Sequence, residues 1–531
     1  MLVRSLLAAL LVASPLLPAR LRAADLLELR LDGLHLPLDL RELEAWTRDP
    51  LHPQGDLGAW LDLLEPVSRA NLLRLLQAPL VRDRSLAQQL LQSWAGQRVL
   101  EELGDLIQSE QGNAAPQLLA SLSQLLQRQP QVSSIELLRA VPVRQLSLNL
   151  DGLLQFAAQW RLQLRQQQRA LQALRQLPLP QRSPLMPITD GVALARGAPP
   201  LDPKLASPQR LSLAVAHRRE PLELLVWPPS ASASPRSGPW VLLSPGLGGS
   251  STQLEWLAVA LRQRGWPVLL LDHPGSDERA VRELLDGRRP PPGAETLRDR
   301  LLDLQAVVAA EQAGRLPRLG DSVVLMGHSL GGLASLLAAG LRPEPGLPRR
   351  CERALDGIPL INLSQLLQCQ LPQVSLPPPL PLAQPIAGVV SFNGFGSLLW
   401  PQRGLQGLNA PVLLVGGSLD LITPPLSEQL RLFLPAGHAG SRLVLVEGGS
   451  HFSPVRIRQG DQALFRLGEE LVGVDPARVQ ALILSLSSEF LQGLQQPRPL
   501  PVQRRLLAGV TAYVLDHGAA DRWRSAIRSG P

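Results

Sequence analysis

Ser329 lies between two glycines in the segment VVLMGHSLGG. Gly327 and Gly331 stand two positions on either side of it, where a Cβ would collide in a sharp turn. Residues 323–326 are an apolar run typical of a buried parallel strand, and residues 333–341 are a small-residue run typical of a helix. A serine at such a strand-to-helix turn has the setting of a nucleophile elbow. This order favours a nucleophile over the alternative, a structural turn with a bystander serine.

A serine hydroxyl is a weak nucleophile at neutral pH, so it needs a base, and the base needs an acid to orient it. In chains with this elbow the order is Ser, then Asp or Glu, then His. Asp420 follows the apolar segment 411–417, and His451 follows the segment 442–448. Both are expected at the carboxyl ends of parallel strands, where catalytic groups of open α/β sheets gather. The sequence therefore predicts a Ser329–His451–Asp420 triad.

Other histidines compete for the role of base. His273 also follows an apolar segment, but it precedes Ser329 in the chain, so we expect it to line the pocket rather than to join the triad. His328 is expected to pack beside the turn, and His438 lies at the opposite edge of the predicted sheet. The choice of His451 follows.

Acyl transfer also needs hydrogen-bond donors for a tetrahedral oxyanion. We expect the backbone N–H of Leu330, directly after the serine, and that of Leu247, in the loop SPGLGGSS. This loop also nearly matches the dinucleotide fingerprint G-x-G-x-x-G, but it lacks the last glycine. Asp272, at the end of the next apolar segment, keeps nucleotide binding as a weaker alternative.

These residues must be positioned by a sheet. Apolar, strand-like segments follow one another after residue 208, at 210–217, 222–229, 240–244, 267–272, 322–326, 386–392, 411–417 and 442–448. The first two alternate like an antiparallel pair, and helical patterns fall between several of the others. Strands that alternate with helices predict a doubly wound, mostly parallel sheet. With the elbow after the fifth segment, the pattern is typical of α/β-hydrolase topology.

The rest of the chain suggests further divisions. Residues 26–40 alternate around an Asp-Gly pair and predict a hairpin, and Asp39 with Glu42 resembles a capping box. The following residues are rich in Leu, Gln and Arg with helical periodicity, up to a proline-rich stretch. We predict a mainly helical N-terminal domain, a linker and a catalytic domain over 25–177, 178–208 and 209–531.

Residues 1–24 have the anatomy of a signal peptide: a basic residue, an apolar run and two small residues at the end. The sequence therefore predicts export to the periplasm or the medium, with an uncleaved N-terminal membrane anchor as the alternative. Cys351 and Cys369 can pair in an oxidising compartment or remain free thiols, because their spacing does not fix their distance.

Composition excludes several functions. The 531 residues are 45% apolar and 18% charged, as in a globular protein of two domains. Arginine carries the formal net charge of +7, with no long basic block and few aromatic residues, which argues against nucleic-acid binding. No cluster of metal-ligand type is visible, and no cofactor is expected.

Residues 152–177 form an amphipathic stripe that fits a membrane surface or, the interpretation we favour, packing on neighbouring helices.

The chain resembles the cyanobacterial α/β-hydrolases described as predicted dienelactone hydrolases, in which a helical domain of unknown function precedes the catalytic domain. The motifs that carry the resemblance are ELRLDGL, LSPGLGGSS, LDHPGS, GHSLGG, SLDLITPP and GGSHFSP. It implies the same triad, although Pro245 stands where relatives more often have histidine. A more distant similarity to platelet-activating-factor acetylhydrolases and bacterial lipases implies ester substrates. Because the nucleophile is serine and not cysteine, dienelactone hydrolysis is not implied.

The segment 343–385 is longer than a strand–helix–strand connection requires. Its ends are proline-rich and its middle is apolar, which predicts an insertion that covers the acyl pocket. The alternative is a surface excursion packed against the N-terminal domain. We expect an exported serine hydrolase that cleaves hydrophobic or lipid-like esters. The competing hypothesis is a hydrolase-like binding protein whose helical domain engages a partner or a membrane.

Overall fold

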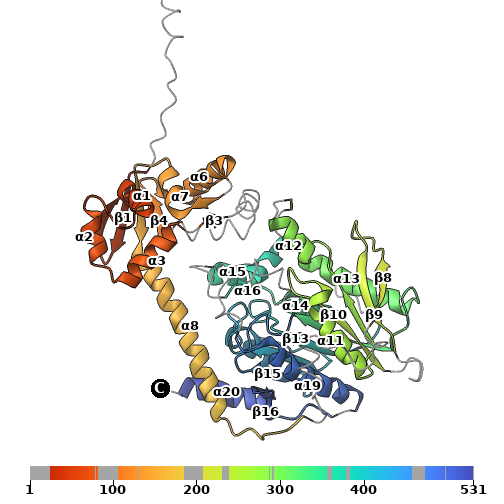
Figure 1. Cartoon of the computed structure of the whole chain (residues 1–531). Helices are drawn as coiled ribbons and strands as arrows, with labels where there is room; N and C mark the ends of the chain where they lie inside the picture. Colours follow the sequence, from red (N-terminus) through yellow and green to blue (C-terminus); the bar gives the residue numbers. More distant parts are fainter. Residues whose placement is uncertain are drawn as a thin grey trace, which may run out of the picture. The chain divides into compact units, whose positions relative to one another are not determined.

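The computed structural model describes residues 24–77, 79–81, 104, 106–129, 131–184, 207–229, 238–285, 288–289, 292–355, 362–377, 383–456, 473–496 and 498–529. The predicted signal peptide, apart from Ala24, and most of the predicted linker lie outside these residues. The chain divides into two compact units, Met1–Ala157 with Leu285–Arg288 and Ala158–Leu284 with Arg289–Pro531 (Figure 1). This division falls within helix α8 (Leu150–Gln176), whereas the boundary predicted at 177 coincides with the end of that helix.

The first unit contains a five-stranded sheet of order β2-β1-β7-β4-β5. Its strands are β1 (Leu26–Leu31), β2 (Leu34–Asp39), β4 (Ile107–Ser109), β5 (Gly112–Asn113) and β7 (Gln145–Asn149). The predicted hairpin is confirmed as β1 and β2, which turn at Asp32 and Gly33. Both residues have positive φ, 49° and 76°, as a tight hairpin turn requires.

Helices cover this small sheet. They are α1 (Leu40–Arg48), α2 (Leu57–Asp62), α3 (Pro66–Gln77), α6 (Ala115–Arg128) and α7 (Ser134–Ala140), with a short pair formed by β3 (Pro79–Val81) and β6 (Val132–Ser133). Asp39 caps α1 by accepting the N–H of Arg41 at 2.6 Å. The capping box is wrong, because the carboxylate of Glu42 accepts the N–H of Leu57 at 3.3 Å. Leu40, Trp46 and Leu146 lie in the core of the unit.

The second unit is built on a ten-stranded sheet of order β16-β17-β15-β14-β13-β12-β10-β11-β9-β8. Every strand predicted after residue 208 is present: β8 (Gln209–Leu213), β9 (Leu222–Trp227), β10 (Pro239–Ser244), β11 (Val268–Leu271), β12 (Ser322–His328), β13 (Ile386–Phe392), β14 (Val412–Gly417) and β15 (Arg442–Val446). The six strands β10 to β15 run parallel, and β9 is antiparallel to β11. The predicted doubly wound, mostly parallel sheet is confirmed.

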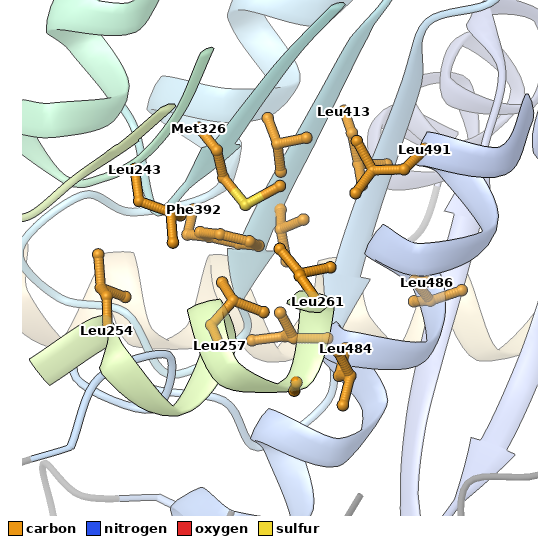
Figure 2. Close-up of a cluster of buried hydrophobic side chains, with 14 of the residues drawn as sticks. Leu243, Leu254, Leu257, Leu261, Met326, Phe392, Leu413, Leu484, Leu486 and Leu491 are labelled. Carbon is orange, nitrogen blue, oxygen red and sulfur yellow. The ribbon is translucent and has the colours of Figure 1, made fainter. Parts of the chain in front are cut away.

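Helices and strands of this unit share one large core. Its helices include α11 (Ser251–Gln263), α12 (Glu278–Leu285), α13 (Glu295–Gln312), α14 (Leu330–Ala338), α19 (Pro476–Gln495) and α20 (His517–Ser529). Figure 2 shows Leu257 of α11, Leu484 of α19 and Phe392 of the sheet in one cluster of buried side chains. Leu242 and Leu325 alternate with the strand residues of this cluster and are equally buried. Since successive side chains point to opposite faces, both faces of the sheet are covered.

A C-terminal hairpin extends the sheet beyond β15. It consists of β16 (Gln503–Leu507) and β17 (Val510–Leu515), and β17 pairs antiparallel with β15. The turn is formed by Ala508 and Gly509, both with positive φ. The sequence analysis did not predict this hairpin.

The later part of α8 packs within the second unit. Leu174 is fully buried there, and the indole N–H of Trp523 donates to the carbonyl of Ala170 at 2.8 Å. Arg175 forms an ion pair with Glu447. Packing therefore accounts for this part of the amphipathic stripe.

Candidate active site

Ser329 occupies the turn between β12 and α14 with a strained backbone, φ 52° and ψ −117°. A Cβ on Gly327 would overlap the carbonyl carbon of Gly331, and a Cβ on Gly331 would overlap the carbonyl oxygen of Ser244. Only glycine fits at either position, as the elbow pattern predicts. The N–H of Ser329 donates to the carbonyl of Phe392 at 2.8 Å, which ties the turn to β13. The strain is of the kind that functional sites keep.

The structure brings Ser329, His451 and Asp420 together at the carboxyl ends of parallel strands. The Oγ of Ser329 lies 3.1 Å from Nε2 of His451, and Nδ1 of His451 lies 2.9 Å from Oδ2 of Asp420. All three residues are buried, Asp420 completely. In the tautomer that fits these contacts, Nδ1–H donates to the carboxylate and Nε2 is free to accept the serine proton. The arrangement can therefore remove a proton from Ser329.

Asp420 is held by its own loop. Oδ1 accepts the N–H groups of Ile422 and Thr423, at 2.9 and 2.8 Å. Oδ2 accepts the hydroxyl of Thr423 at 2.6 Å in addition to the imidazole N–H. These bonds leave one carboxylate oxygen aimed at His451. The sequence analysis missed Thr423, although its place three residues after the acid is an ordinary side-chain turn position.

Two neighbours hold the loop that carries His451. His328 donates from Nε2 to the carbonyl of His451 at 2.8 Å, and the amide of Asn393 donates to the same carbonyl at 2.9 Å. His328 packs beside the turn with its ring centroid 5.0 Å from that of His451. Burial, and secondarily the charge of protonated His451, lowers the pKa of His328 to about 3. His328 is thus a neutral support and not a second base.

The expected oxyanion donors also lie near each other. Leu330 is the first residue of α14, so its N–H has no partner within the helix. Among the described residues, no group accepts the N–H of Leu247, whereas the next N–H, of Gly248, donates to the carbonyl of Ser276 at 2.8 Å. Leu247 and Leu330 line the same narrow apolar pocket. A free N–H at a helix start is suited to an oxyanion.

Comparisons with known families agree with the fold. Residues 23–149 match the family described as alpha/beta hydrolase of unknown function (DUF1400), and residues 241–463 match the alpha/beta hydrolase family. The chain carries α/β-hydrolase family domains. None of the curated proteins compared with this hydrolase matches it. The fold class predicted from the sequence is confirmed.

His273 and Asp272, which the sequence singled out as a pocket residue and as a sign of nucleotide binding, both have partners within the protein. His273, expected to line the pocket, is instead fully enclosed between Ser244 and Asp303. Asp272 accepts the N–H and the hydroxyl of Ser251, at 2.5 and 3.0 Å, at the start of α11. That carboxylate is therefore engaged by the protein itself, which removes the support for the nucleotide alternative.

Cys351 and Cys369 form a disulfide with a Cα–Cα distance of 5.5 Å. It joins α15 (Leu347–Ala354) to α16 (Ser364–Gln370).

In the described part of the hydrolase, no group of three or more His, Cys, Asp or Glu side chains could hold a metal ion. None of the described helices combines the length and the hydropathy needed to cross a bilayer.

Acid is expected to destabilise the hydrolase through His273 and His328, two of its buried histidines. Burial, and secondarily the charge of Arg300, lowers the pKa of His273 to about 4, and that of His328 is about 3. Below the histidine pKa of the unfolded chain, near 6.5, both histidines bind a proton in the unfolded chain but not in the folded one. The free energy of unfolding therefore falls as pH falls. Each histidine contributes a slope of about 1.4 kcal/mol per pH unit down to its folded pKa.

The free energy of unfolding in urea, measured from pH 7.5 to 5, checks this expectation. It should be level above the unfolded pKa and fall below it. The variant His328→Gln, whose amide can still donate to His451, should halve the slope, whereas His52→Gln, at an exposed histidine, should not change it. A free energy that stays level from pH 6.5 to 5 would contradict the assignment of two neutral buried histidines.

Proposed function

We propose that this protein is a serine hydrolase that cleaves carboxylic esters through an acyl-enzyme. The observation that carries the proposal is the unbroken hydrogen-bond chain from Ser329 Oγ through His451 to Asp420. The chain begins at a strained elbow and has free backbone N–H groups beside it. A binding protein has no need for this combination.

In the first step, Oγ of Ser329 attacks the ester carbonyl carbon while Nε2 of His451 takes the hydroxyl proton. The carbonyl π electrons move to the oxygen, which the N–H groups of Leu330 and Leu247 receive. Asp420 stabilises the imidazolium. Collapse of the intermediate breaks the bond to the leaving alcohol, which takes the proton from His451. Water then attacks the acyl-enzyme in the same way and releases the acid.

The apolar pocket beside the oxyanion donors supports a hydrophobic acyl group. Its lining includes Leu297 of α13 together with Leu367 and Leu371 from the predicted insertion. Its volume is about 20 Å³, little more than one water molecule needs. An acyl chain of several carbons therefore requires the lining to move, and the insertion supplies part of that lining.

The described part of the 343–385 insertion is built against the active-site loops. The N–H of Ser364, at the start of α16, donates to the carbonyl of Ile422 beside the catalytic acid, at 3.2 Å. The buried carboxylate of Glu428 accepts the amide of Asn362 at 2.7 Å and the hydroxyl of Ser364 at 3.0 Å. We propose that this segment covers the acyl pocket. Residues 356–361 and 378–382 of the insertion lie outside the described residues.

The disulfide supports the predicted export, because such bonds persist in oxidising compartments. The disulfide links helices α15 and α16 of the insertion, so it also limits how far the insertion can move away from the acyl pocket. Export by the predicted signal peptide, with an N-terminal anchor as the alternative, is part of the proposal.

The dependence of kcat/KM on acyl chain length tests both the proposed ester hydrolysis and the proposal that the insertion covers the acyl pocket. On a panel of p-nitrophenyl esters from acetyl to dodecanoyl, kcat/KM is expected to be highest for a medium chain. In Leu371→Ala, which widens the pocket, the preference for a longer chain over acetyl should rise about tenfold.

Leu363→Ala is the matched control, because Leu363 lies in the same insertion and is 36% exposed. It should leave the chain-length profile unchanged. A preference for acetyl esters in the unaltered enzyme, or an equal response of the two variants, would remove the support for the cover.

A further inference from the structure

Arg300, on helix α13, is a fully buried cation that binds the loop carrying Leu247. Its Nη1 donates to the carbonyl of Pro245 at 2.6 Å, and its Nη2 donates to the carbonyl of Gly246 at 2.8 Å. Its Nε donates to the hydroxyl of Ser276 at 2.9 Å. One guanidinium thus fixes two successive carbonyls of the loop. Arg300 is distant in sequence from the loop that it binds, and it is not a member of the triad.

The bond to Gly246 has a direct chemical consequence. The carbonyl of Gly246 and the N–H of Leu247 belong to one trans peptide group, so they point in opposite directions. By holding the carbonyl, Arg300 fixes the direction of the N–H. A cation on the oxygen also draws electron density from the peptide, which makes the N–H a stronger donor.

The charge of Arg300 is not neutralised by direct pairing. Among the described residues, no carboxylate lies within ion-pair distance of its guanidinium, whereas Arg218 nearby pairs with Asp303 at 2.6 Å. Burial lowers the pKa of Arg300 to about 9, so the side chain remains a cation at neutral pH. A buried, unpaired charge is costly to stability. Its two shortest hydrogen bonds go to the carbonyls of Pro245 and Gly246, and the others go to the hydroxyl and the carbonyl of Ser276.

A second buried chain fixes the strand end from which this loop leaves. The hydroxyl of Ser244, the last residue of β10, donates to Nε2 of His273 at 2.8 Å, and Nδ1 of His273 donates to Asp303 at 2.7 Å. The three residue types are those of a catalytic triad, but all three side chains have no exposed surface. Substrate cannot reach them. They hold the loop at one end, and Arg300 holds its next two residues.

We propose that Arg300 is the positioning residue of the oxyanion hole: it orients and polarises the Gly246–Leu247 peptide so that Leu247 donates to the oxyanion. The inference deepens the proposed ester hydrolysis and rests on it. Arg300 does not touch substrate. Its effect should therefore be seen where negative charge forms on the substrate oxygen, and not in ground-state binding.

Steady-state kinetics on the best ester of the panel test this role in Arg300→Gln and Arg300→Lys. Arg300→Gln should lose about 10²-fold in kcat with little change in KM, as expected when one oxyanion donor is lost. Arg300→Lys keeps the charge but not the two-pronged donor, so it should lose about tenfold. Arg298→Gln is the matched control on the same helix, since that half-exposed arginine pairs with Asp299. It should behave as the unaltered enzyme.

A trifluoromethyl ketone with the same acyl chain gives the second readout. It forms a hemiketal oxyanion with the serine, so its inhibition constant should rise in proportion to the loss of kcat/KM, whereas the Kd of the corresponding non-reactive alkyl ether should not change. Unchanged kcat in a folded Arg300→Gln or Arg300→Lys, or equal losses for the ketone and the ether, would overturn the inference alone. If the unaltered enzyme neither hydrolyses the esters nor binds the ketone, the proposed function fails and the inference fails with it.

Discussion

Alanine at position 329 is expected to lower kcat/KM for a carboxylic ester by about 10⁵-fold, because the change removes the only atom that bonds to the substrate carbon. The Oγ of Ser329 contacts Nε2 of His451 and fills no part of the hydrophobic core. The fold should therefore remain, with an unchanged thermal unfolding temperature. The activity that remains in Ser329→Ala is expected to come from the oxyanion donors and the pocket.

Initial rates and a thermal unfolding curve check this expectation in Ser329→Ala. Ser322→Ala is the matched control, since Ser322 opens the same strand and its hydroxyl donates to the carboxylate of Asp321 at 3.0 Å. The control should retain full activity. If Ser329→Ala kept more than about a hundredth of the activity, another residue would have to be the nucleophile.

Asparagine at position 420 is expected to lower kcat by about 10⁴-fold. Oδ1 of Asp420 accepts two backbone N–H groups, so an amide oxygen would take that place and the amide nitrogen would face His451. The imidazole would then have to accept at Nδ1 and carry its proton on Nε2. In that tautomer it cannot take the proton of Ser329.

The measurement is kcat at saturating ester for Asp420→Asn, beside Asp321→Asn as a control at an exposed aspartate far from the triad. The double variant Ser329→Ala/Asp420→Asn should be no slower than Ser329→Ala, because the three residues act as a unit. A loss below about tenfold in Asp420→Asn would contradict a role for this carboxylate in setting the tautomer.

The grouping of Ser329, His451 and Asp420 could be predicted from the sequence, because the proposed chemistry constrains residue type, order and position at once. Ser329 is marked by two glycines that only a tight turn requires, and Asp420 and His451 each follow an apolar strand. These signals are local. The strand order of the sheet then brings the three ends together.

The supporting contacts could not be predicted in this way. Arg300 stands in the run ETLRDRLLDL, whose alternating charges indicate a solvated helix face. In the fold, Arg300 and Asp303 are both fully buried, and their partners Gly246 and His273 come from other segments of the chain. Nothing in the local pattern distinguishes a buried charge with distant partners from an exposed one.

The C-terminal hairpin was missed for a related reason. Its turn is Ala508–Gly509 rather than Asn-Gly, and its first strand holds adjacent arginines. Arg505 is nevertheless buried, because Glu489 of α19 accepts from its guanidinium at 2.7 and 2.8 Å. In the first unit, strands such as Gly112–Asn113 are too short to show a period of two. The sequence therefore predicted its helices and its first hairpin but not the rest of its sheet.

Covalent labelling tests the central claim most directly. A fluorophosphonate reacts only with a serine activated by a neighbouring base, and mass spectrometry of the digested protein identifies the labelled residue. The structure predicts one phosphonyl adduct per chain, on Ser329, absent from Ser329→Ala and strongly slowed in His451→Ala. No label on the folded protein, or label that persists on another residue in Ser329→Ala, would contradict the claim that Ser329 is the nucleophile.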